Sequence, residues 1–248
     1  MTTSQRPPTI LATSGGLKRG EWTQLSPAPL MWHALELTGV RRPKLAYLGT
    51  PSGDTRNFAG LLHEAFYGTE VDLTCVSLLP MPNVSDLRAH LLSRDAIWVG
   101  GGSVAGLLAL WRLHGVDEIM RECWEAGVVL AGVSAGSICW HVGGTTDSFG
   151  PRLRPVTDGL ALLPYSNGVH YDSEPSRRPT YQGLIADGGL PDGYATDDTV
   201  GLLYHGTELV EAVRESRSDA AAYRVERLPD GTVRETRIEP RQLPDTAG

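Results

Sequence analysis

One serine lies between two glycines in a pattern that could make it a nucleophile. Gly132-Val-Ser-Ala-Gly136 follows the apolar run from Val128 to Ala131. A G-x-S-x-G motif between a strand and a helix is typical of a nucleophile elbow, a turn so tight that only small residues fit beside the serine. We therefore predict that Ser134 stands above a sheet edge as a nucleophile. The alternative is an ordinary glycine-rich turn in which the serine caps a helix.

Three successive glycines, Gly100-Gly101-Gly102, end the apolar run that begins at Asp95. Glycines let the backbone come close to a ligand with its N–H groups directed at it. One of them could donate to an oxyanion together with the N–H of Ala135, which opens the predicted helix after the serine. A phosphate-binding loop is disfavoured, because the segment lacks both G-K-[ST] and the G-x-G-x-x-G spacing.

A serine nucleophile needs a base, and His170 is the best placed of the seven histidines. It lies in Val169-His-Tyr-Asp-Ser-Glu174, after a proline-rich segment where we expect an active-site loop. The other six are expected to be surface or packing residues, because they lie in or beside predicted helices or in a late turn: His33, His63, His90, His114, His141 and His205.

The residues leave open which acid orients the histidine. Asp147 lies between the serine and His170 in sequence, whereas Asp197 and Asp198 precede a predicted strand and could reach the ring from its end. Glu174 is close to His170 in sequence and could instead contact substrate. An aspartate is more often a turn cap or a solvated carboxylate, so each candidate has this alternative.

Short apolar runs that end in glycine or serine predict the sheet that positions these residues. They are continuous rather than alternating, as in strands buried on both faces of a parallel sheet: Thr9–Gly16, Lys44–Thr50, Asp95–Gly102 and Gly127–Gly136, with 71–79 as a less clear fifth. Helical patterns lie between them at 57–67, 85–92 (with Ser85 as N-cap), 103–113 and 116–126. Alternating strands and helices predict an α/β fold with a doubly wound, mostly parallel sheet, which binds ligands at the carboxyl ends of its strands.

The chain changes character after about residue 150. Six prolines between Pro151 and Pro191 predict a segment that is mostly loop with short elements. From Thr199 onward, two hairpin patterns predict a late antiparallel meander: 201–204 with 208–213, and 221–228 with 232–238 around Pro229-Asp-Gly231. We find no linker or repeat, so the expectation is a single domain over residues 1–248.

Composition narrows the classes of partner. Hydrophobic residues make up 41% of the chain and charged residues 21%, and this hydrophobic content is enough to form a core. The net charge is −7, and the sequence has no run of basic residues. We therefore expect neither a nucleic-acid nor a membrane partner. Three cysteines without a C-x-x-C pair argue against a disulfide scaffold or a zinc site, and we expect no metal. The N-terminal residues do not resemble a signal peptide, so a cytoplasmic location is expected. The oligomeric state stays open, with a homodimer as one option.

Taken together, the motifs resemble a known family. The ordered set of Gly100-Gly-Gly102, Gly132-Val-Ser-Ala-Gly136, Thr145-Thr-Asp147 and Val169-His-Tyr171 closely resembles the peptidase E (aspartyl dipeptidase) and cyanophycinase family of serine peptidases. The resemblance covers most of the chain and implies a fold similar to class I glutamine amidotransferases. Those enzymes carry a cysteine at the elbow, where this sequence has Ser134.

The resemblance also implies roles for individual residues. Ser134 would be the nucleophile, His170 the general base, and the backbone of Gly101, Gly102 and Ala135 the oxyanion hole. The acid would be Asp147 by similarity to dipeptidase E, or Asp197 by similarity to cyanophycinase-like members. The expected substrate contacts are Tyr171, Glu174, Arg177 and Arg178.

The function that follows is hydrolysis of short peptides through an acyl-enzyme, without a metal or an organic cofactor. An arginine downstream of the histidine would suit an acidic residue next to the scissile bond, although the intervening loop looks shorter than in the family. Two alternatives remain at this point: an esterase or amidase of the α/β-hydrolase type, and a non-catalytic module that binds a small molecule on the same scaffold.

Overall fold

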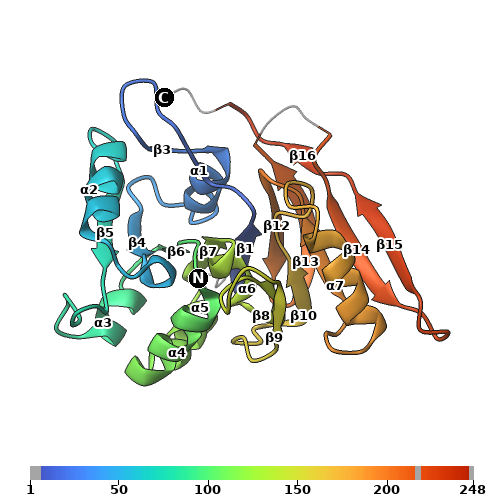
Figure 1. Ribbon diagram of the computed structural model, residues 1–248. Coiled ribbons are helices and arrows are strands. Elements are labelled where there is room, and N and C mark those ends of the chain that lie inside the picture. The colour runs from blue at the N-terminus through green and yellow to red at the C-terminus, as the bar shows by residue number, and fades with distance from the viewer. Residues whose placement is uncertain (1–6, 216–218, 246–248) are drawn as a thin grey trace, which may run out of the picture.

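The computed structural model describes residues 7–215 and 219–245, which form two large sheets with helices around them (Figure 1). In this described part, the larger sheet has eight strands in the spatial order β16 (Arg241–Gln242), β13 (Glu208–Arg214), β12 (Val200–His205), β1 (Thr9–Thr13), β7 (Val129–Val133), β6 (Ala96–Val99), β4 (Lys44–Leu48) and β5 (Asp72–Val76).

The centre of this sheet is parallel, as its apolar runs predict. Strands β1, β7, β6, β4 and β5 pair in parallel, whereas β12 and β13 add antiparallel strands beyond β1. The carboxyl ends of parallel strands meet at one edge. The sheet therefore brings together the residues that follow β1, β6 and β7, which are Ser14, the triple glycine and Ser134.

Helices cover both faces of the sheet, so it is doubly wound. Alternate residues of each strand point to opposite faces: Ile97 and Val99 of β6 join one core, and Ala96 and Trp98 join the other. The first core is covered by α3 (Leu87–Leu92), α4 (Val104–His114), α5 (Val116–Glu125) and α6 (Ala135–Ile138), and the second by α1 (Pro29–Glu36) and α2 (Arg56–Ala65). The α/β fold class is confirmed.

A second sheet corrects the expectation of a mostly irregular segment after residue 150. In the described residues it has six strands in the order β15 (Val233–Ile238), β14 (Ala222–Arg227), β11 (Gly193–Thr196), β10 (Leu163–Gly168), β8 (His141–Thr146) and β9 (Arg154–Val156). The prolines are compatible with these strands and with the helix that follows, because they occupy positions where the lack of a backbone N–H is tolerated. Pro155 lies on the edge strand β9 and Pro164 near the start of β10, while Pro179 lies in the first turn of α7 (Arg177–Ala186).

The two late hairpins form as predicted but do not make one meander. β12 and β13 pair with each other in the larger sheet, whereas β14 and β15 pair in the second sheet. Residues 193–215 therefore pass from one sheet to the other. Hydrophobic pattern alone predicts a strand and its hairpin partner, but not which sheet a hairpin joins.

Smaller elements complete the fold. The short strands β2 (Leu17–Lys18) and β3 (Ser26–Pro27) form a hairpin directly after β1, and a 3₁₀ turn, η1 (Thr50–Ser52), follows β4. The N-cap of α3 is Asp86, whose carboxylate accepts from the Ala89 N–H at 2.9 Å, and not Ser85 as predicted. Within residues 7–215 and 219–245, no helix combines the length and apolar character needed to cross a bilayer.

The carboxylate of Glu215, the residue that follows β13, lies next to the first turn of α1. Its Oε1 accepts from the Leu30 N–H at 3.2 Å, and a side chain at Gly15 would come within 2.9 Å of Oε2. Burial raises the pKa of Glu215 to about 7, because few groups replace the water that an ionised carboxylate loses. The folded protein therefore keeps this proton over a pH range in which the unfolded chain releases it.

We expect Glu215 to make stability depend on pH below neutrality. As the pH rises from about 4.5 to about 7, the carboxyl ionises in the unfolded chain before it does so in the folded protein, so the free energy of unfolding falls. Glu215→Gln keeps an acceptor for Leu30 and removes the charge. It should raise the free energy of unfolding at pH 8 by about 2 kcal/mol and flatten its dependence over this range, measured by urea unfolding at several pH values.

Glu208→Gln is the matched control, since Glu208 is exposed on the same strand. It should change the free energy of unfolding by less than about 0.5 kcal/mol. Equal effects of the two substitutions would contradict the burial argument.

Candidate active site

Ser134 occupies a sharp turn between β7 and α6. Its backbone has φ 57° and ψ −111°, a region that non-glycine residues rarely adopt. Backbone hydrogen bonds hold the turn: the Ser134 N–H donates to Thr13 O at 3.0 Å, and the Ser134 carbonyl accepts from Ser137 N and Ile138 N at 2.9 Å each. The geometry is that of a nucleophile elbow, with the hydroxyl side chain at the carboxyl edge of the sheet.

The two glycines of the motif are required by the packing of this turn. A Cβ at Gly132 would lie 2.4 Å from the carbonyl oxygen of Gly136, and a Cβ at Gly136 would lie 2.3 Å from the carbonyl oxygen of Val99. Both obstacles are backbone atoms, which cannot rotate away. The short helix α6 therefore lies directly against the end of β6.

The triple glycine lies beside the serine. A Cβ at Gly101 would be 3.4 Å from Ser134 Cβ, so the two residues are neighbours across β6 and β7. Gly102 has φ 133°, and a Cβ there would be 2.4 Å from the Pro51 carbonyl oxygen. Ala135 is the first residue of α6, where a backbone N–H has no acceptor within the helix. The structure thus places Gly101, Gly102 and Ala135 around the serine.

His170 reaches the site from the second sheet, two residues after β10. It has φ 53°, and its backbone N–H donates to Ser14 Oγ at 3.1 Å. Ser14 follows β1 of the larger sheet, and its Oγ also lies 2.7 Å from the Oγ1 of Thr196, at the end of β11. Ser14 thus joins the histidine loop to both sheets. We did not predict this role; the only sequence signal was its place in the Ser-Gly-Gly that ends the first apolar run.

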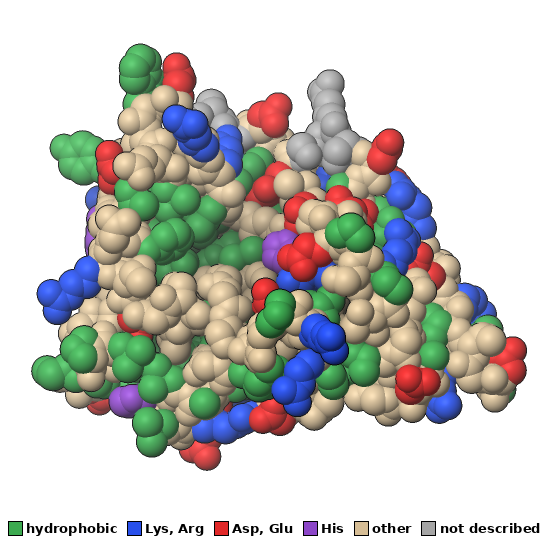
Figure 2. Space-filling view, viewed as in Figure 1, with side chains coloured by type: hydrophobic (Ala, Val, Ile, Leu, Met, Phe, Trp, Pro, Cys, Tyr) green, Lys and Arg blue, Asp and Glu red, His purple; other side chains and the backbone are tan. Residues whose placement is uncertain are grey.

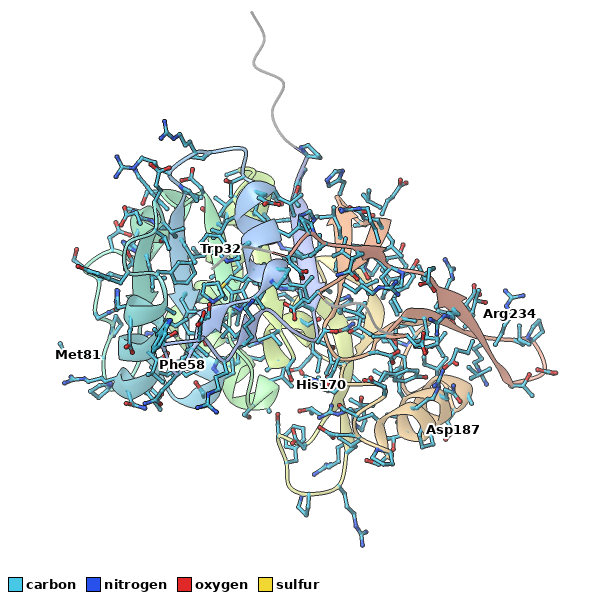
Figure 3. The ribbon with its side chains drawn as sticks, turned by 90° about the horizontal axis from the view of Figure 1, so that it is seen from above. Trp32, Phe58, Met81, His170, Asp187 and Arg234 are labelled. Carbon is cyan, nitrogen blue, oxygen red and sulfur yellow. The ribbon has the colours of Figure 1, made fainter. Side chains whose placement is uncertain are left out.

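Asp198 is the acid that touches the histidine. Its Oδ1 lies 2.5 Å from His170 Nδ1, and its backbone N–H donates to Asp172 Oδ1 at 2.8 Å. A carboxylate in this position favours a proton on Nδ1 and leaves Nε2 as the nitrogen free to accept one. In Figure 3, His170 lies between the part of the molecule that carries Phe58 and the part that carries Asp187.

The two acids that we favoured from the sequence lie elsewhere. Asp197 is turned the other way: its Oδ2 accepts from the Ala221 N–H at 2.9 Å and from the Tyr223 hydroxyl at 3.2 Å, and burial raises its pKa. Asp147 is exposed on the loop after β8, and it lines the same cavity as His170 without engaging Nδ1. The sequence leaves Asp147, Asp197 and Asp198 open as candidates; the last two are neighbours whose side chains have different partners.

Ser134 and His170 face one open cavity of about 450 Å³. Among the residues that the structure describes, the cavity is lined by Gly102, Ser103, Ser134, Asp147, Ser148, His170, Glu174 and Arg177. A larger cavity of about 870 Å³ lies between α2 and the segment 77–83, and neither Ser134 nor His170 lines it. The smaller cavity is the candidate active site because the serine, the histidine, Glu174 and Arg177 all line it.

Of the four predicted substrate contacts, the structure brings two to the cavity. Arg177 is 4% exposed, and its Nε and Nη2 lie 2.8 and 3.0 Å from the two carboxylate oxygens of Glu174. Tyr171 and Arg178 belong to a different cluster. The Tyr171 hydroxyl donates to Glu235 Oε2 at 2.8 Å, and Arg178 donates to the same oxygen at 3.1 Å while its guanidinium stacks on the Tyr171 ring.

The other histidines are structural or peripheral. His33, His63, His90 and His114 lie on helices, as predicted. His141 is fully buried in β8, where its Nδ1 bonds to the Ser137 carbonyl and burial lowers its pKa to about 4. Among the described residues, no cluster of three or more histidine, cysteine or carboxylate side chains is arranged to bind a metal ion.

Comparison with known proteins identifies the family. The model of peptidase family S51 matches residues 10–212. The chain is 40% identical over 216 residues to YgaJ of Bacillus subtilis strain 168, described as an uncharacterized peptidase; the match covers 87% of this chain and 91% of that protein. The chain belongs to peptidase family S51. It is thus a serine peptidase, and the resemblance to the peptidase E family noted from its motifs is confirmed.

Two further relatives agree with this assignment. Peptidase E of Shewanella denitrificans is 33% identical over 89 residues, or 36% of this chain and 38% of that protein. The solved structure of a peptidase from an acI-B1 Actinobacterium superimposes with a TM-score of 0.66 at 15% identity, covering 98% of both chains. At that identity the second likeness shows a shared fold.

The packing of the S51 elbow gives a test based on glycine. Gly136→Ala should lower the free energy of unfolding by more than about 3 kcal/mol, or prevent folding, because the new methyl group meets the Val99 carbonyl oxygen. Gly60→Ala is the matched control: Gly60 lies inside α2 with open space around its Cα, so alanine should stabilise the protein by about 0.5–1 kcal/mol. Chemical unfolding of both variants measures the difference, and a tolerated Gly136→Ala would contradict the close approach.

Proposed function

We propose that Ser134, His170 and Asp198 form the catalytic triad of a dipeptidase that acts through an acyl-enzyme. The observation that carries the proposal is the contact of 2.5 Å between His170 Nδ1 and Asp198 Oδ1, beside a serine held at positive φ in the same cavity. A carboxylate on Nδ1 fixes the tautomer in which Nε2 can take the serine proton. Asp198 replaces Asp147 and Asp197 in this assignment.

The reaction uses the groups in the following order. His170 Nε2 accepts the proton of Ser134 as the hydroxyl oxygen attacks the peptide carbonyl, and the imidazolium that forms is stabilised by Asp198. In this proposal the backbone N–H groups of Gly101, Gly102 and Ala135 donate to the developing oxyanion. His170 then protonates the leaving amine, and water attacks the acyl-enzyme by the same route in reverse.

Arg177 supports a preference for an acidic residue next to the scissile bond. Its guanidinium is buried at the cavity wall, and Glu174 occupies only part of its five N–H donors. A substrate carboxylate could bind to the remaining donors, with Glu174 holding the guanidinium in place. Arg178 and Tyr171 are less suited to this role, because both are engaged with Glu235. The proposed substrates are therefore short peptides with one acidic residue.

The esterase and binding-module alternatives are less well supported. The chain after His170 continues into six further strands within the described residues, unlike an α/β-hydrolase, whose histidine lies near the end. A non-catalytic module would have no use for a strained serine beside a paired histidine and aspartate. Family membership supports the peptidase in both comparisons.

Removal of the nucleophile is the first test. Ser134→Ala should lower kcat/KM for an Asp-containing dipeptide by about 10⁴-fold or more, with an unchanged melting temperature, because the hydroxyl is lost and the backbone bond to Thr13 is kept. Hydrolysis is followed by the release of free amino acid, with Asp, Glu and Asn compared at the acidic position. A variant that keeps full activity on these peptides would exclude Ser134 as nucleophile.

The identity of the acid is tested by two isosteric substitutions. Asp198→Asn should lower kcat by about 10²–10⁴-fold, because an amide no longer favours the required tautomer of His170. Asp147→Asn is the control, since Asp147 lines the cavity without engaging His170 Nδ1, and its effect should be below about tenfold. A large loss in Asp147→Asn together with a small loss in Asp198→Asn would contradict the assignment.

A further inference from the structure

A hydrophobic hollow lies on the side of Ser134 away from the charged side chains. Most hydrophobic side chains of the core beneath α1 and α2 are buried. At the carboxyl edge of the sheet, four hydrophobic residues that pack against this core are only partly buried: Leu17, Leu25, Phe58 and Val133. We call this surface the apolar hollow. Figure 2 shows a depression with hydrophobic side chains on its floor, a histidine at its rim, and acidic and basic side chains beyond that histidine.

The apolar hollow is formed by elements that lie next to one another at this edge. Leu17 and Leu25 belong to the β2–β3 hairpin and its loop, and β3 packs beside both α1 and α2. Phe58 lies in the first turn of α2. In Figure 3, Phe58 and His170 lie at the same edge of the molecule, whereas Trp32 of α1 is set back from it. The hollow and the histidine therefore open on the same face.

Contacts connect the apolar hollow to the nucleophile. Val133 directly precedes Ser134, and a Cβ at Gly101 would lie 3.9 Å from Val133 Cγ1 and 3.4 Å from Ser134 Cβ. On the far side, the centroids of the Phe58 and Tyr47 rings are 5.6 Å apart, and the Tyr47 hydroxyl leaves no room for a Cβ at Gly100. The path from Phe58 to Ser134 thus runs through Tyr47 and the triple glycine.

The two sides of the nucleophile differ in chemistry. Beyond His170 the cavity wall carries Asp147, Glu174 and Arg177. On the opposite side, Leu17, Leu25, Phe58 and Val133 offer only hydrocarbon. A peptide whose carbonyl lies at Ser134 would place one side chain toward each wall. Covering the apolar wall favours substrate binding only when the substrate atoms that cover it are themselves apolar.

We propose that the apolar hollow is the subsite for an apolar side chain of the substrate, on the side of the scissile bond opposite the acidic residue. This inference rests on the proposed function, because it assumes a peptide bond held at Ser134. It extends that function from peptides with one acidic residue to dipeptides that pair an acidic residue with an aliphatic or aromatic one. Phe58 and Val133 are its specificity-determining residues.

Two dipeptide series test the proposal on the unmodified enzyme. One keeps Asp first and varies the second residue, and the other keeps Asp second and varies the first, with Leu and its near-isostere Asn at the varied position. In one of the two series, kcat/KM for the Leu peptide should exceed that for the Asn peptide by at least about tenfold. A ratio below threefold in both series, or no hydrolysis of any member, would overturn the proposal.

Variants then locate the preference in the hollow. Phe58→Ser should lower the Leu-to-Asn ratio at least about threefold, because it replaces part of the apolar surface with a hydroxyl. Leu113→Ser is the control: Leu113 is 77% exposed on α4, so both the ratio and kcat/KM should stay unchanged. A thermal melt of each variant shows whether it is folded. The comparison of Leu and Asn on the unmodified enzyme stands even where Phe58→Ser does not fold.

The outcomes separate this inference from the proposed function. Loss of hydrolysis in Ser134→Ala with equal rates for Leu and Asn peptides would refute the subsite and leave the serine peptidase intact. Full activity in Ser134→Ala would refute the proposed function first. A dimer in sedimentation that Phe58→Ser dissociates, with the Leu-to-Asn ratio unchanged, would assign the hollow to a second copy of the chain and overturn the substrate assignment.

Discussion

The site depends on one close approach of backbone to backbone. Helix α6 can lie against the end of β6 only because position 136 has no side chain to meet the Val99 carbonyl oxygen, and position 132 has none to meet Gly136. This contact leaves a single residue, Ser134, to reverse the chain, and that residue takes a positive φ. The cost of this conformation is offset by the hydrogen bonds around the turn and by the buried core beneath it. Where the serine hydroxyl points is thus a consequence of packing rather than of any contact that the hydroxyl makes.

The nucleophile and the base come from different sheets. Ser134 and the triple glycine follow strands of the larger sheet, whereas His170 follows β10 of the second sheet and Asp198 lies between β11 and β12, where the chain passes between the sheets. Ser14 joins the two parts, because its hydroxyl receives the His170 N–H and lies against Thr196. A small shift between the sheets would therefore separate serine from histidine while leaving each sheet intact. This arrangement makes the hydrogen bonds of Ser14 as important for the geometry as the glycines of the elbow.

The parts of the structure that the sequence predicts are those determined locally. A buried parallel strand is a short apolar run that ends in glycine, and this pattern correctly placed β1, β4, β6 and β7 and the elbow between β7 and α6. The second sheet was missed because prolines at edge positions and in the first turn of α7 look the same in sequence as prolines in loops. The choice between Asp197 and Asp198 depends on which way one residue faces at a crossing between sheets, and no periodic pattern reports this. Asp197 instead holds the Ala221 N–H and the Tyr223 hydroxyl, which is a structural role.

Electrostatics explains how a charged wall and an apolar wall can lie on either side of Ser134. Arg177 is buried, and an unpaired guanidinium there would be costly, so Glu174 accompanies it and the pair adds little net charge to the cavity. Arg177 opens α7, which is packed on the second sheet, and Glu174 lies just before that helix. The hydrophobic residues lie on α2, the β2–β3 hairpin and β7, around the larger sheet. Each wall thus takes its character from the sheet that supports it. Ser134 and His170 line one cavity between the two sheets. A substrate with one polar and one apolar end would therefore place its polar end toward the second sheet and its apolar end toward the larger sheet.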